Sequence, residues 1–232
     1  MHVKLDLKII LVLLIFFLTD QIEMYLLFMF FAILHELGHL IMGMLLGFKP
    51  KGMKLIPMGV SICFHINCEN YNINVKNGKI ISLKKLLIAM AGPVTNFFIA
   101  IFFMVLNIDV LNFTREEIIY SNLLIGIFNL IPIYPLDGGR IIKNIIHINT
   151  DLIKAYKYTN LISNITLIII TAISSIAILY FKNIAILLIV LYLWILLIKE
   201  NNIYNKKMHL YKLIDEIGDT KEMYEDDMLQ FR

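Results

Sequence analysis

The chain has 232 residues, of which 59% are hydrophobic and 17% are charged, and its formal net charge is +3. An ordinary soluble domain is about half apolar and about a quarter charged. The composition therefore excludes such a domain and favours an all-α protein that crosses a lipid bilayer several times. No nucleic-acid partner is expected.

Six apolar segments are predicted as transmembrane helices. They cover residues 8–19, 24–47, 83–106, 118–136, 158–181 and 184–198. The first segment resembles a signal peptide, but no small-residue cleavage site follows it, so we interpret it as a retained helix. Only Lys182-Asn183 separates the last two segments, which predicts a tight helical hairpin.

Lysine and arginine are distributed unevenly between the connections. If the N-terminus lies in the cytoplasm, then of the lysine and arginine residues near the spans only Arg115 and Lys182 fall on the outer side. Loops rich in lysine and arginine stay in the cytoplasm. The charge pattern therefore predicts six spans with both termini in the cytoplasm.

A small membrane-associated β-hairpin or sheet is predicted between the second and third helices. Residues 54–66 are rich in β-formers, and residues 72–75 and 79–82 flank Asn77-Gly78, a favoured type I′ turn pair. Two interpretations remain open. The strands form an ordinary connection, or an edge strand pairs with an extended peptide substrate.

Two regions follow from this organisation. Residues 1–199 are predicted as a six-span membrane domain, and residues 200–232 as a polar cytoplasmic tail. The two cysteines, Cys63 and Cys68, do not make a disulfide framework, and we expect ordinary thiols.

The sequence His35-Glu36-Leu37-Gly38-His39 lies inside the second apolar segment. Ionisable side chains are costly in hydrocarbon, so their presence there indicates a functional site. Residues four apart share one face of a helix, so His35 and His39 can bind one metal ion together. Glu36 is then placed to take a proton from a water molecule on that metal.

A third metal ligand is needed, because a catalytic zinc usually has three protein ligands and one position for water. Asp137 is our candidate. It follows Pro132 and Pro135, which interrupt the fourth helix, and it precedes two glycines. Irregular backbone at membrane depth is tolerated where it is buried in protein or lines a wet cavity. The alternative is that Asp137 is only a turn residue, since Asp-Gly is a common turn pair.

Other polar residues allow two interpretations. Asn129 is either an interhelical hydrogen-bonding residue or a residue that holds substrate or stabilises an oxyanion. Arg140 is interpreted as a cytoplasmic anchor rather than a catalytic group.

Three motifs in this order resemble the site-2 protease family of intramembrane zinc metalloproteases. They are residues 35–39, the run Ala91-Gly92-Pro93-Val94-Thr95-Asn96, and residues 129–140. The resemblance covers residues 24–140, which would form the catalytic core. It implies that His35, His39 and Asp137 hold one zinc ion and that Glu36 activates water. It also implies supporting or substrate-positioning roles for Asn96, Asn129 and Pro135.

The resemblance further implies a transmembrane or membrane-tethered protein substrate, cleaved within or near the bilayer, and inhibitory membrane partners. The six-segment layout is similar to members that process a sigma-factor precursor during sporulation. Such a member would lie in the forespore outer membrane, and otherwise in the bacterial cell membrane. The nucleotide-binding CBS domain of well-known members has no counterpart in the tail. An alternative from another class is a metal transporter or a metal-sensing membrane protein.

Overall fold

A computed structural model describes residues 2–5, 17, 20–56, 59–65, 75–106, 108–110, 113–181 and 184–230. The described chain is mostly helical and divides into two compact units. Unit 1 extends to residue 132 and includes residues 136–151, whereas unit 2 consists of residues 133–135 and everything from residue 152. The predicted helix at residues 8–19 lies outside the described residues except for Phe17, and so does Cys68.

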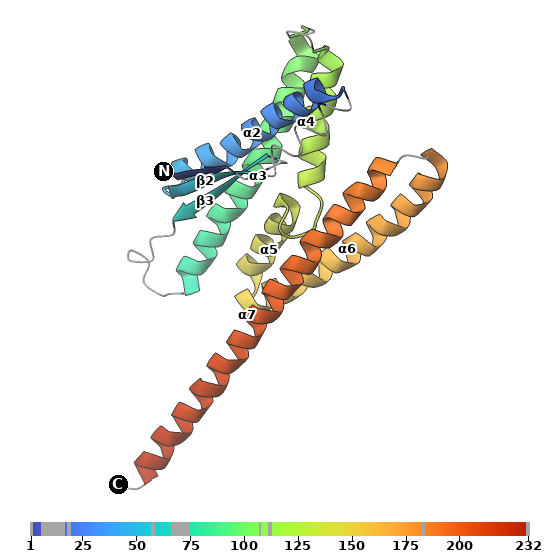
Figure 1. The fold of residues 1–232 in the computed structure, drawn as a ribbon. Helices are drawn as coiled ribbons and strands as arrows, with labels where there is room; N and C mark the ends of the chain where they lie inside the picture. The colour runs from blue at the N-terminus through green and yellow to red at the C-terminus, as the bar shows by residue number, and fades with distance from the viewer. Residues whose placement is uncertain are drawn as a thin grey trace. The chain divides into compact units, whose positions relative to one another are not determined.

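Unit 1 contains four described helices, and three of them pack around the fourth, α3 (Val75–Leu106). The other three are α2 (Ile22–Leu45), α4 (Arg115–Asn129) and α5 (Asp137–Asn149). Helix α3 contacts each of the other three, and α2 also contacts α4 (Figure 1). Leu27, Phe31 and Ile118 form a buried apolar cluster, so α2 and α4 pack together at one end.

The spacing of the buried residues along α3 explains why this helix is central. Its buried residues Ser82, Ala89, Pro93, Asn96 and Ala100 recur at helical spacing. Such residues lie on one face of a helix. Small side chains predominate on this face, so neighbouring helices can approach it closely.

A three-stranded sheet in the order β1–β2–β3 belongs to the same unit. Strand β2 (Lys49–Ile56) pairs in parallel with β1 (His2–Leu5) and antiparallel with β3 (Gly59–His65). The register shifts between Pro50 and Gly52. Helix α2 contacts β2 and β3, so the sheet lies beside the helix that carries both histidines.

The predicted turn at Asn77-Gly78 is wrong. Residues 75–106 form one continuous helix, so residues 79–82 are helical rather than extended. Turn preference is a weak, local signal that tertiary packing overrides. Here Ser82 is buried on the packed face of α3, which favours extending the helix upstream of its apolar part.

Helix α4 begins at a capping box and ends earlier than the sequence predicted. Thr114 and Glu117 form a capping box at its start, which satisfies free backbone N–H groups. The helix ends at Asn129, whereas the sequence predicted a helix to residue 136. Pro132 and a cis Tyr134-Pro135 peptide bond lie in the intervening loop. Proline cannot continue the backbone hydrogen bonds of a helix, so the chain turns before α5 begins.

Unit 2 contains a pair of long helices, α6 (Leu152–Phe181) and α7 (Ile184–Gln230), which contact each other. The side chain of Trp194 donates a hydrogen bond to Thr171, and Asn201 donates one to Asn164. Helix α7 continues through most of the polar residues predicted as a tail.

Four of the described helices are long and apolar enough to cross a membrane. These segments are Ile22–Leu45, Gly78–Leu106, Leu152–Tyr180 and Ile186–Tyr211. Helix α4 has 15 residues and is too short for this group, so the six predicted spans are not established by the structure. The four helices indicate an integral membrane protein.

Candidate metal centre

His35 and His39 lie on one face of α2, one helical turn apart. Their side chains are buried, with 3% and 4% of each residue exposed. The two rings meet edge to face, and their Nε2 atoms are 3.1 Å apart. The helix therefore presents both imidazoles to one point in the interior of unit 1.

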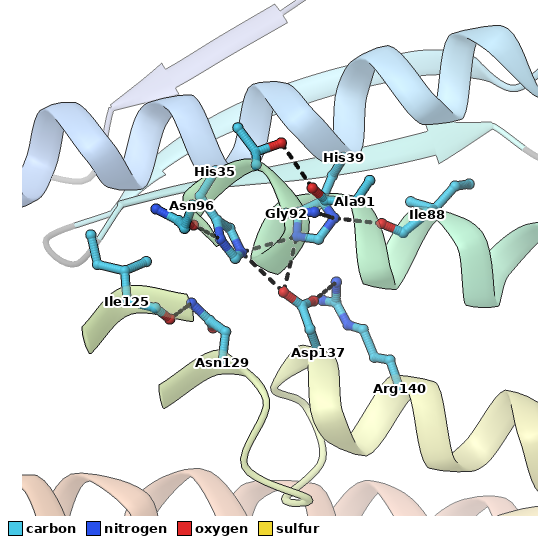
Figure 2. A network of polar contacts seen from close by, with 11 residues as sticks. His35, His39, Ile88, Ala91, Gly92, Asn96, Ile125, Asn129, Asp137 and Arg140 are labelled. Atoms are coloured by element: carbon cyan, nitrogen blue, oxygen red, sulfur yellow. Dashed lines mark hydrogen bonds and ion pairs between the residues drawn. The ribbon is translucent and has the colours of Figure 1, made fainter. Parts of the chain in front are cut away.

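Asp137 is the first residue of α5 and reaches the same point. Its Oδ2 atom lies 3.0 Å from Nε2 of His35 and 3.0 Å from Nε2 of His39. Figure 2 shows the three side chains converging from α2 and α5. A carboxylate is favourable in the first turn of a helix, where the N–H groups are free. The loop after α4 thus returns Asp137 to the histidines.

Gly138 makes this return possible. A Cβ atom on Gly138 would lie 2.5 Å from the carbonyl oxygen of Ile131 and still closer to that of Leu130. Both obstacles are backbone atoms, which cannot rotate away. Only glycine fits here, so the Asp-Gly pair is required for tight packing of α5 on the preceding loop.

The side-chain chemistry of His39 identifies which ring nitrogen is free. Its Nδ1 lies 2.6 Å from the carbonyl oxygen of Ile88 on α3. A carbonyl oxygen can only accept, so Nδ1 carries the proton and donates. The neutral ring then has a lone pair on Nε2, the atom that faces Asp137.

His35 is held in a similar way by Asn96 of α3. Its Nδ1 lies 2.5 Å from Oδ1 of Asn96, which is fully buried. Asn96 in turn donates through Nδ2 to Oδ1 of Asn122 on α4 at 3.0 Å. With Nδ1 donating, His35 also directs an Nε2 lone pair at Asp137.

Zinc fits this set of atoms. Two imidazole nitrogens and one ionised carboxylate oxygen lie 3.0–3.1 Å apart with their lone pairs directed at a common point. These lone pairs repel one another, and a shared cation stabilises the arrangement. Ligand atoms of a tetrahedral zinc stand about 3.3 Å apart and leave a fourth position for water. Among the described residues, these three are the group of histidines, cysteines and acids that can hold a metal ion.

Gly92 gives the two rings their space. A Cβ atom on this residue would lie 2.6 Å from Nε2 of His35 and 2.5 Å from Cε1 of His39. The sequence marks Gly92 only as part of a motif, and this role was not predicted. The signal was a Gly-Pro pair inside an apolar helix, where glycine otherwise lowers helix stability.

Asn122 was also missed by sequence reasoning. It is fully buried on α4, and its Nδ2 donates to the carbonyl oxygen of Ile118 at 2.9 Å. A buried asparagine in an apolar helix was the available signal, the same one that drew attention to Asn129.

Glu36 and Asn129, two further predicted site residues, lie near this centre, as does Arg140. Glu36 is half-buried and follows His35 directly on α2. Asn129 is half-buried at the end of α4, where its Nδ2 donates to the carbonyl oxygen of Ile125 at 3.0 Å. Arg140 contacts the second oxygen of Asp137 (Figure 2) at 3.5 Å. Its side chain is half exposed. Pro135 forms the cis peptide bond with Tyr134, in the loop before Asp137.

The packing of α5 against α3 brings a second pair of side chains together. Ser82 of α3 and His147 of α5 are hydrogen-bonded at 2.5 Å. Partial burial lowers the pKa of His147, and the positive charges of Lys85 and Lys143 lower it further. Asp151 opposes this effect.

Together, the apolar helices and the three converging side chains form a buried group that can hold a metal ion in an integral membrane protein. Residues 112–173 match Peptidase family M50. This part of the chain, which includes Asp137, is therefore similar to that family, and the chain is homologous to the proteins described next.

Two curated proteins are similar in sequence. The zinc metalloprotease MJ0392 of Methanocaldococcus jannaschii is 32% identical over 133 residues, which cover 54% of this chain and 35% of that protein. Stage IV sporulation protein FB of Bacillus subtilis is 27% identical over 127 residues, covering 54% of this chain and 41% of that protein. The similarity thus spans less than half the length of each relative.

A solved structure, the site-2 protease from Methanocaldococcus jannaschii, has a similar fold. The TM-score is 0.62 at 25% sequence identity, and the match covers 85% of this chain and 89% of that chain. The helical architecture is therefore of the site-2 protease type.

Proposed function

We propose that this protein is an intramembrane zinc metallopeptidase that cleaves a transmembrane or membrane-tethered protein within or near the bilayer. The observation that carries the proposal is the meeting of His35, His39 and Asp137 in the interior, with Glu36 beside His35 on an apolar helix. Homology to zinc metalloproteases supports the same activity.

His35, His39 and Asp137 would hold one zinc ion. When bound, zinc lowers the pKa of a water molecule to about 7 and polarises a carbonyl group. Asn96 and the Ile88 carbonyl keep both histidines in the tautomer that leaves Nε2 free. Such supporting contacts orient ligands and raise their basicity.

Glu36 acts as the general base. Its carboxylate accepts a proton from the attacking water and later passes that proton to the leaving amine nitrogen. The scissile C–N bond breaks, and the products are a carboxylate and an amine. Asn129 and Pro135 would position the substrate, and Arg140 would steady the second oxygen of Asp137.

A substrate helix must unwind before its peptide bonds can react. We propose that it pairs as an extended strand with β3, which lies at the edge of the sheet in the order β1–β2–β3. Main-chain hydrogen bonds at a sheet edge bind extended peptides. The contact of β3 with α2 supports this assignment, because α2 carries the histidines.

The membrane arrangement belongs to the proposal as well. Residues 1–199 would form the membrane domain, with six spans, both termini in the cytoplasm and the remaining residues on the cytoplasmic side. The asymmetry of lysine and arginine supports this orientation. A sigma-factor precursor in sporulation is our candidate substrate, supported by the similarity to stage IV sporulation protein FB.

The test uses purified protein in proteoliposomes with candidate membrane-tethered precursors. We expect the wild type and Glu23→Gln to cleave and Glu36→Gln to be inactive. Glu23 is an exposed acid at the start of the same helix, so it controls for the loss of a carboxylate. Full cleavage by Glu36→Gln would refute the mechanism. Zinc flux into vesicles that persists in Glu36→Gln, without cleavage by the wild type, would indicate a transporter instead.

A further inference from the structure

An unbroken line of hydrogen bonds joins the backbone of α4 to His35. The Ile118 carbonyl oxygen accepts from Asn122 at 2.9 Å, and Asn122 Oδ1 accepts from Asn96 at 3.0 Å. Asn96 Oδ1 then faces Nδ1 of His35 at 2.5 Å. Both asparagines are fully buried, so no solvent competes for these contacts.

The direction of this line is fixed at its far end. The Ile118 carbonyl can only accept, so Asn122 must present its NH₂ group there and its oxygen to Asn96. Asn96 must then present its own NH₂ group to Asn122 and its oxygen to His35. The backbone of α4 thereby determines that Nδ1 of His35 donates and that Nε2 is free.

We infer that Asn122 is a positioning residue that sets the tautomer and ring orientation of His35 through Asn96. The inference rests on the proposed metal site and adds a residue from α4 to the contacts made by α2, α3 and α5. Without Asn122, the amide of Asn96 is free to turn its NH₂ group toward Nδ1. That ring nitrogen would then accept, and the proton would move to Nε2, where it competes with the metal.

Other asparagines show that the link to Asn96 distinguishes Asn122. Asn144 of α5 is buried and donates to the carbonyl oxygen of Arg140 four residues earlier at 2.9 Å, as Asn122 does to Ile118. Asn144→Leu therefore removes the same local bond from a buried position without removing the link to Asn96. It is the matched control for Asn122→Leu.

The experiment titrates Co²⁺ into the full-length, metal-free protein in detergent and follows the visible absorption of the bound ion. We expect Asn122→Leu to weaken Co²⁺ binding by about 10-fold or more, as loss of such supporting contacts does in other metal sites. Asn144→Leu should stay within about twofold of the wild type. The absorption spectrum of Co²⁺ in Asn122→Leu should also change, because the His35 ring is no longer held.

A rescue variant separates positioning from folding. A buried carboxylic acid favours its neutral form, which offers one O–H donor and one acceptor. Asn122→Asp can therefore donate to Ile118 and accept from Asn96, and we expect it to recover most of the Co²⁺ affinity. Asn122→Asp also serves as the test if Asn122→Leu does not fold. In that case its Co²⁺ affinity is compared with that of Asn96→Leu. If folded Asn122→Asp loses as much affinity as Asn96→Leu does, the inference is contradicted.

The outcomes distinguish this inference from the proposed function. Unchanged Co²⁺ affinity in Asn122→Leu, or no Co²⁺ binding by the wild type, would overturn the role of Asn122. A third outcome is that the wild type binds Co²⁺ tightly, that Asn122→Leu binds it more weakly as expected, and that the wild type cleaves no membrane protein. This outcome would support the role of Asn122 and refute proteolysis.

Discussion

Gly92 packs so closely against His39 that a Cβ atom on the glycine would lie 2.5 Å from Cε1 of the ring. The same atom would lie 2.6 Å from Nε2 of His35. The absence of a side chain at this glycine of α3 thus determines where both imidazole rings can lie.

Gly92→Ala should therefore displace both rings and weaken metal binding. A misplacement of about 1 Å at a catalytic group can cost about 100-fold in rate, and we expect a loss of peptidase activity on that scale. Gly78→Ala on the same helix is the control, because no atom of the described residues beyond its own helical turn lies within 4 Å of its Cβ position. Zinc content and cleavage should be unchanged in Gly78→Ala, and equal zinc content in Gly92→Ala would contradict the steric argument.

The contact between Gly38 of α2 and Thr95 of α3 gives a second prediction. A Cβ atom on Gly38 would overlap the hydroxyl of Thr95 and lie 3.0 Å from the carbonyl oxygen of Ala91. Overpacking of this kind costs about 1–3 kcal/mol, so Gly38→Ala should lower the free energy of unfolding.

Removing the Thr95 hydroxyl should recover part of that loss. We expect a favourable coupling of about 1 kcal/mol between Gly38→Ala and Thr95→Ala in a double-mutant cycle measured by unfolding in detergent. Additive effects of the two substitutions would show that the two helices do not meet at this point in solution.

The lowered pKa of His147 predicts that the stability of the fold depends on pH. Burial, with Lys85 and Lys143, lowers its pKa below the ordinary value, and Lys79 adds to the effect while Asp151 opposes it. The unfolded chain then binds more protons than the folded chain as the pH falls below about 6.5. Stability contributed by neutral His147, which contacts Ser82, is thus present above that pH and lost below it.

The substitution His147→Gln keeps a hydrogen-bonding side chain but cannot titrate. The fall in unfolding temperature between pH 7.5 and pH 5.5, about one unit either side of the ordinary histidine pKa, should be smaller in this variant than in the wild type. Identical slopes in the two proteins would show that His147 does not contribute.

The sequence was most informative where the chemistry is local. The spacing of His35 and His39 places two imidazoles on one helical face, and hydrocarbon makes such residues conspicuous. Asp137 was singled out because prolines and glycines around it disrupt the helix. The structure brings these three side chains together, while their role as zinc ligands stays a prediction.

Contacts between distant helices could not be predicted in this way. The roles of Gly92 and Asn122 depend on how α3 meets α2 and α4, and no local pattern specifies that register. The error at Asn77-Gly78 has the same origin, because a strong turn signal was overridden by packing of Ser82. The end of α4 at Asn129 was missed by seven residues because apolar character continues to Leu136 without helical structure.

The most direct test of the account is the zinc content of the purified protein. Wild type and Glu36→Gln should each carry about one zinc per chain, because Glu36 is the base and not one of the three ligands. Asp137→Leu should lose most of the zinc, since it removes the oxygen that lies 3.0 Å from both histidines. Full zinc occupancy in Asp137→Leu would contradict the proposed centre.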